Sequence, residues 1–190
     1  MHQRPDLRGF ISIDIEASGS HPGRYAMLSL GACSVVDPSS TFYAELQPTT
    51  LEFEPEAMAV HGLSLEHLQK EGMAPDQAMT AFADWIRQQA PSGYPPVFVA
   101  YNAVFDWMFV TEYFFRSLGR NPFGHTALDI RAVYFGLTHD PWRAIRFADL
   151  AARYLNSQQL THHALEDAQL QAALLRAMLA SGPPIQGGKA

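Results

Sequence analysis

Residues 10–16 read Phe-Ile-Ser-Ile-Asp-Ile-Glu. From Ile11 onward, apolar and polar side chains alternate, which is typical of a β-strand with one buried face. Asp14 and Glu16 lie two residues apart, so their carboxylates point to the same face of that strand. A solvated sheet face would explain the pair by itself. Two close carboxylates repel each other and desolvate badly without a cation, however, so the stretch also indicates a candidate hard-metal site.

The sequence around this strand predicts a sheet flanked by helices. Short turns at Pro22-Gly23 and at residues 37–40 separate it from two further strands, residues 27–36 and 41–46, which favours an antiparallel meander. After the meander, predicted strands alternate with predicted helices. These later elements are helices within 55–71 (broken at His61-Gly62), at 75–89, 103–118, 145–155 and 164–180, strands at 97–101 and 126–130, and a helix ending near Gly136.

This order of elements predicts an α/β fold with a mixed five-stranded sheet, in which the meander continues into parallel strands. With 190 residues, 47% of them apolar and 17% charged, the chain has ordinary globular composition and the length of one domain. We expect its core at about residues 10–180, with a polar N-terminus and a flexible tail at 181–190.

The net charge of −6 excludes a protein that binds nucleic acid through a uniformly basic surface. Any nucleic acid must therefore be held locally or through metal ions. The single Cys33 excludes an internal disulfide and favours a reducing compartment. Residues 1–8 lack the apolar core of a signal peptide, and no apolar stretch reaches membrane-spanning length. We therefore expect a cytoplasmic protein without a membrane association.

Asp106 is a third candidate ligand, because it opens the helix that follows the predicted strand at 97–101. Its position has a structural explanation, since a helix N-terminus interacts favourably with a negative charge. Phe105 and Trp107 are its immediate neighbours, however, and a carboxylate buried among such side chains needs a partner.

Asp167 is the fourth candidate, near the start of the last predicted helix. Ala164 and Ala168 belong to a small apolar face that permits close packing, and Asp167 follows Ala164 by three residues, so it can share that face. Glu166 is expected to point elsewhere, into solvent. Two histidines, His162 and His163, precede this helix. A helix N-terminus disfavours a protonated imidazole, which keeps a histidine there available as a base, although a lone histidine at such a position is more often a cap or a surface residue.

Taken in order, these residues resemble a known family. Three segments are similar to the motifs of the DEDDh exonucleases. They are Asp14-Ile15-Glu16, Asn102 to Asp106 with the pattern Asn-x-x-Phe-Asp, and His162 to Ala168 with the pattern His-x-x-x-x-Asp-Ala. This DnaQ-like group includes the proofreading subunit of bacterial DNA polymerase III, ribonuclease T and oligoribonuclease. The segment His61-Gly62-Leu63-Ser64 resembles a further family segment, and the resemblance covers roughly residues 10–180.

The resemblance implies a ribonuclease H-like fold and a metal-dependent 3′→5′ exonuclease acting on single-stranded nucleic acid. Two divalent ions, Mg²⁺ or Mn²⁺, suit a set of oxygen ligands and this chemistry. Asp14 would bridge both ions, Glu16 and Asp167 would complete the ion that activates water, and Asp106 would support the second ion. Family spacing selects His162, five residues before Asp167, as the base, and leaves His163 packed or solvated.

The resemblance also implies substrate contacts from Gly19, His61 and Asn102. Each has a structural alternative, namely a turn glycine, a helix-terminal histidine and a helix cap. Three arginines lie on or next to one predicted helix, namely Arg143, Arg146 and Arg153. They either steer the nucleic acid strand towards the site or belong to an ordinary solvated surface.

The sequence leaves several alternatives open. A trimming enzyme for RNA similar to oligoribonuclease or ribonuclease T, a phosphodiesterase for short oligomers, and a non-catalytic nucleic-acid-binding scaffold are the competing functions. The choice between DNA and RNA depends on how the pocket treats a 2′-hydroxyl. Some relatives are dimers, so a homodimer is compatible with the resemblance, although no segment demands one.

Overall fold

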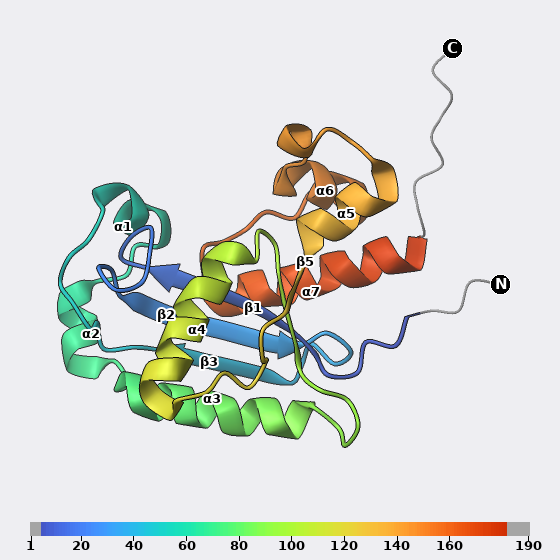
Figure 1. Cartoon of the computed structure of the whole chain (residues 1–190). Coiled ribbons are helices and arrows are strands. Elements are labelled where there is room, and N and C mark those ends of the chain that lie inside the picture. The colour runs from blue at the N-terminus through green and yellow to red at the C-terminus, as the bar shows by residue number, and fades with distance from the viewer. Residues whose placement is uncertain (1–4, 182–190) are drawn as a thin grey trace, which may run out of the picture.

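A computed structural model describes residues 5–181, which form a five-stranded sheet covered by helices (Figure 1). The strand order is β3-β2-β1-β4-β5. Antiparallel pairs join β1 to β2 and β2 to β3, whereas parallel pairs join β1 to β4 and β4 to β5. The predicted meander and mixed sheet are therefore confirmed. The strands are β1 Phe10–Ala17, β2 Met27–Ser34, β3 Thr41–Glu45, β4 Val97–Ala100 and β5 Ala127–Asp129.

Several helices begin or end at local sequence signals. Prolines occupy the first turns of α1 and α3, and left-handed glycines, Gly62 and Gly119, end α1 and α4. None of the helices between residues 5 and 181 combines the length and apolar character needed to cross a membrane. The helices are α1 Pro55–His61, α2 Leu65–Glu71, α3 Pro75–Gln89, α4 Val104–Leu118, α5 Ile130–Thr138, the 3₁₀ helix η1 Trp142–Ala144, α6 Phe147–Tyr154 and α7 Ala164–Ser181. Apart from Ser181, the predicted flexible tail lies outside the described residues.

The central strand β1 separates an apolar face from a polar one. Ile11, Ile13 and Ile15 belong to the core cluster that contains Phe82 of α3 and Phe114 of α4. Because side chains alternate along a strand, the even-numbered positions, including both carboxylates, project from the opposite face, which α7 covers. The alternation read from the sequence thus places the carboxylates between the sheet and the last helix.

Gly31 allows α7 to approach the sheet closely. It pairs with Asp14 across the β1–β2 ladder. A Cβ atom at this position would lie 2.2 Å from the backbone carbon of Ala164, so only glycine fits without movement of the helix. Ala164 and Ala168 are fully buried at this contact, as their small size predicts. The close approach brings the first turn of α7 next to the carboxylates of β1.

Candidate active site

The carboxyl ends of β1 and β4, the first turn of α4 and the segment preceding α7 surround a pocket of about 300 Å³. We call it the carboxylate pocket. All five predicted catalytic positions line it, although they come from three separate parts of the chain. The lining residues are Asp14, Ile15, Glu16, Tyr101, Asn102, Phe105, Asp106, Leu160, His162, Asp167 and Gln171.

The carboxylate of Asp14 is held by a residue that the sequence did not suggest. Gln171 of α7 donates a 2.6 Å hydrogen bond from Nε2 to Oδ1 of Asp14. Its Oε1 accepts the backbone N–H of Tyr101 at 2.7 Å, and its side chain is buried. The amide is therefore fixed at both ends, which orients it unambiguously. A sequence signal existed, because Gln171 follows Asp167 by four residues and so shares its helix face.

Asp106 is the third residue of α4 and is almost fully buried. Its Oδ1 accepts the backbone N–H of Ile15 at 3.1 Å, which ties the start of α4 to the central strand. Burial, helped by the charge of Asp129, raises the pKa of Asp106 from 3.8 to about 7, against the effect of backbone N–H donors. The carboxylate thus has a structural role in addition to its place in the pocket.

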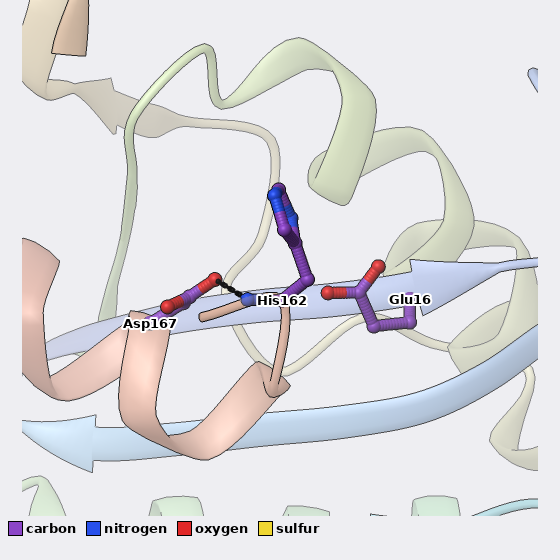
Figure 2. A group of neighbouring side chains, drawn as sticks. All are labelled: Glu16, His162 and Asp167. Atoms are coloured by element: carbon purple, nitrogen blue, oxygen red, sulfur yellow. Dashed lines mark hydrogen bonds between the residues drawn. The ribbon is translucent and has the colours of Figure 1, made fainter. Parts of the chain in front are cut away.

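Asp167 organises the segment that carries His162. One oxygen accepts the backbone N–H of Thr161 at 2.8 Å, and the other accepts that of His162 at 3.0 Å (Figure 2). His162 adopts a left-handed backbone with φ of 58°, which is uncommon for a residue other than glycine. Such strain persists only where the surroundings impose it, and it concentrates at functional sites. Asp167 supplies that constraint here.

Glu16, His162 and Asp167 form a group suited to a cation. Each offers one ligand atom, and the three atoms lie within 4.8 Å of one another. In Figure 2 the histidine stands between a carboxylate from β1 and one from α7. Burial and then the charges of Asp167 and Asp106 raise the pKa of Glu16 from 4.5 to about 8. Burial and the three neighbouring carboxylates likewise raise the pKa of Asp14 well above its usual value.

Within residues 5–181, no lysine or arginine forms an ion pair with any of these four carboxylates. The pocket therefore concentrates negative charge without a protein cation to offset it. Because the donors are carboxylate oxygens, the site fits hard divalent ions such as Mg²⁺ or Mn²⁺ better than soft ones.

The two adjacent histidines have different surroundings. His162 is exposed and lines the carboxylate pocket. The ring of His163 instead stacks on Tyr43 of β3, with centroids 4.7 Å apart and planes 21° apart. Of the two histidines, only His162 is thus placed to act on a molecule in the pocket, and His163 packs on a neighbour, which is one of the two placements expected for it.

Gly19 and His61 line a second pocket of about 310 Å³, which shares Glu16 and Phe105 with the carboxylate pocket. Gly19 lies in the bend at residues 18–20, and a Cβ there would lie 2.4 Å from the ring of Tyr25, so close packing requires a glycine at this position. His61 is the last residue of α1, as its structural alternative expected.

The imidazole of His61 is held at both nitrogens. Its Nδ1 accepts the N–H of Leu63 at 3.1 Å, so the ring is neutral and Nε2 donates to the carbonyl of Ala17 at 3.2 Å. Burial lowers the pKa of this histidine, which favours the same neutral form.

Asn102 does not cap α4. The residue at the cap position is Ala103, whose own side chain makes no capping bond, while its backbone N–H is accepted by Oδ2 of Asp129 at 3.0 Å. Asn102 has a left-handed φ of 57°, and its Oδ1 accepts a 3.1 Å hydrogen bond from Arg131. The structural alternative of a helix cap is therefore wrong, because the side chain turns away towards α5.

Comparison with known proteins identifies the class. The RNase T family model, described as exonuclease, matches residues 11–175, which include the five catalytic candidates. The chain therefore belongs to this exonuclease family and is a hydrolytic nuclease of the DnaQ-like type, as its motifs predicted.

Among individual proteins, the Escherichia coli 3′-5′ DNA exonuclease Cap18 is 45% identical over 173 residues, which cover 91% of this chain and 92% of that protein. The nuclease domain of 3′hExo, a DEDDh family member bound to rAMP, has a TM-score of 0.71 and 13% identity, covering 95% of this chain and 96% of that one. E. coli ExoI in a complex with ssDNA has a TM-score of 0.68 and 18% identity over 92% of this chain. The chain spans only 41% of the length of that ExoI chain. The two structures confirm the predicted ribonuclease H-like fold.

Proposed function

We propose that the chain is a metal-dependent 3′→5′ exonuclease that releases 5′-mononucleotides from single-stranded DNA. The observation that carries this proposal is the convergence of four carboxylates and one exposed histidine in a single pocket. The similarity to a 3′-5′ DNA exonuclease over nearly the whole length of both chains supports the polarity and the choice of DNA.

The four carboxylates would hold two divalent ions, Mg²⁺ or Mn²⁺. When bound, such ions neutralise the phosphate charge, activate water and stabilise the leaving oxygen. Asp14 is central among the four proposed ligands, because the charges of the other three carboxylates all act on it. The hydrogen bond from Gln171 leaves the second oxygen of Asp14 available and sets the plane of the carboxylate.

His162 would serve as the base that removes a proton from the attacking water. Its side chain is exposed and lines the carboxylate pocket, so a water molecule in the pocket can reach it. The two N–H bonds accepted by Asp167 fix the backbone from which the ring projects. Asp167 thus positions the proposed base, His162, and is also one of the four proposed metal ligands.

The second pocket would hold the terminal nucleoside. Gly19 and His61 lie there beside the apolar side chains of Val60 and Phe105, and the wall shared with Glu16 places the pocket next to the proposed metal site. Asn102, at the other pocket, would contact the adjoining part of the strand. All these residues come from one chain, so the proposed reaction requires no second copy.

The test is digestion of a 5′-labelled single-stranded oligodeoxynucleotide with Mn²⁺ or Mg²⁺. We expect a ladder of shortened labelled strands and release of 5′-mononucleotides, both abolished by excess chelator and by Asp14→Ala. Release of the label as the first product would contradict the polarity. Full activity in chelator would contradict the metal requirement.

Two parallel substrates test the remaining parts of the proposal. An RNA strand of the same sequence should be degraded more slowly than the DNA strand, and faster degradation would favour the trimming of RNA instead. Tight binding of either strand without any release of nucleotides would indicate the non-catalytic scaffold.

A further inference from the structure

An exposed aromatic pair lies on the α5–η1 segment. Phe135 of α5 is 40% exposed and Trp142 of η1 is 43% exposed, although large apolar side chains are usually buried. Their rings meet edge to face, with centroids 5.8 Å apart and planes at 80°. The guanidinium of Arg131 lies over the indole, 4.5 Å from its centroid. We call Arg131, Phe135 and Trp142 the Trp142 platform.

Arg131 connects this platform to the carboxylate pocket. One guanidinium nitrogen donates to Oδ1 of Asn102, which lines that pocket, and another donates to the backbone carbonyl of Trp142 at 2.6 Å. The indole is therefore one arginine side chain away from the pocket rim. Asn102 does not line the second pocket, so the platform adjoins the carboxylate pocket and not the proposed site of the terminal nucleoside.

The charge around the platform differs in sign from that of the whole chain. Residues 130–154 contain four arginines and two aspartates, whereas the protein carries a net charge of −6. Arg143 follows Trp142 directly and is exposed, with no ion pair among the described residues. Arg146, by contrast, is paired with Asp149. An exposed indole beside free positive charge is the combination that proteins use to hold single strands, through base stacking and phosphate attraction.

We propose that the Trp142 platform binds the single strand on the 5′ side of the nucleotide being removed. A base of that strand stacks on Trp142, and the neighbouring phosphate meets Arg143. This assignment rests on the proposed function, because that function puts the terminal nucleoside in the second pocket and the bond to be cleaved beside the carboxylates. The next part of the strand then leaves past Asn102 and Arg131.

The test measures kcat and KM of the full chain with Mn²⁺ on oligothymidylates of 2 to about 20 nucleotides. Trp142→Ala should raise KM for the longest strand by about 5- to 150-fold, the usual contribution of one stacked base. For the dinucleotide, which is too short to extend along the platform, the two enzymes should have similar constants. Phe115→Ala is the matched control, because Phe115 is an aromatic residue of α4 with 46% exposure outside the platform.

The outcomes are separable. An equal loss at every length, or no loss at any length, would overturn the platform, and so would a variant that changes only the oligomeric state. If Trp142→Ala fails to fold, Trp142→Leu keeps apolar volume without a stacking ring and should show the same dependence on length. Fluorescence anisotropy of labelled dT20 in chelator reports binding without cleavage. If the unaltered chain does not hydrolyse the strand, the proposed function is wrong. If Trp142→Ala binds dT20 as tightly as the unaltered chain does, only the platform is wrong.

Discussion

Replacement of Glu16 by Gln should stabilise the metal-free protein while damaging its activity. The raised pKa of Glu16, about 8 against an ordinary 4.5, means that the folded state holds a proton that the unfolded state releases. This group therefore contributes stability that is fully present below pH 4.5 and is lost as the pH rises through 8. Above pH 8 the folded protein carries the charge at a cost, and glutamine removes that charge without a large change of shape.

The size of the effect follows from the same pKa values. The difference between 4.5 and about 8 for Glu16 corresponds to ~5 kcal/mol at full effect. Relaxation and water entry into the open pocket reduce such penalties, so we expect about 2 kcal/mol to remain at pH 9. In a domain of this size, 1 kcal/mol shifts the melting temperature by roughly 2–4 °C. Glu16→Gln should therefore melt about 4–8 °C above the unaltered protein.

Thermal melts in chelator at pH 5 and pH 9 provide the measurement. The stabilisation should be present at pH 9 and nearly absent at pH 5, where the folded protein keeps Glu16 protonated. Added Mn²⁺ should reverse the order, because the unaltered protein gains more binding energy. Glu166→Gln is the control, since that glutamate is exposed on the same helix as Asp167. A Glu16→Gln variant that melts at or below the unaltered protein at pH 9 in chelator would refute the reasoning.

Three further changes test the site. Gln171→Leu removes the hydrogen bond to Asp14 and should lower turnover by about 10- to 100-fold through misplacement of that carboxylate; normal turnover in steady-state assays would show that the bond is dispensable. His162→Ala should lower turnover by about 10²–10⁴-fold with metal binding intact, whereas His163→Ala should have a far smaller effect, and the reverse result would show that the assigned base is wrong. Gly31→Ala forces a clash with the start of α7, so it should lower the free energy of unfolding by about 1–3 kcal/mol in thermal melts and should also lower activity. An unchanged melting temperature would show that the helix moves freely.

Most of the fold could be predicted from local patterns. Period-two alternation identified β1 and its polar face, and helix signals such as Pro75 and Gly119 gave bounds close to those observed. The order of elements gave the mixed sheet, because few topologies connect such a series. Gly31 was not singled out, since its importance depends on a helix that arrives more than 130 residues later in the sequence.

The catalytic candidates could also be proposed from sequence, because each lies in a short motif whose residue types and spacing can be recognised locally. The choice between His162 and His163 came from that spacing, and the structure supplies its physical basis in the stacking on Tyr43. For Asn102 the structural alternative of a helix cap failed, because a more distant partner, Arg131, holds its side chain.

The sequence by itself therefore determined the class of enzyme and the five catalytic candidates, since these residues lie in short segments whose residue types and spacing can be recognised locally. Only the tertiary structure decided how those segments act on one another. Gln171 reaches Asp14 across 157 residues of sequence, and the raised pKa of Glu16 arises from burial beside charges on two other elements. Arg131 likewise connects the Trp142 platform to Asn102, which lies in a separate part of the chain. Such contacts depend on sheet order and helix packing, which bring together residues that no local pattern relates.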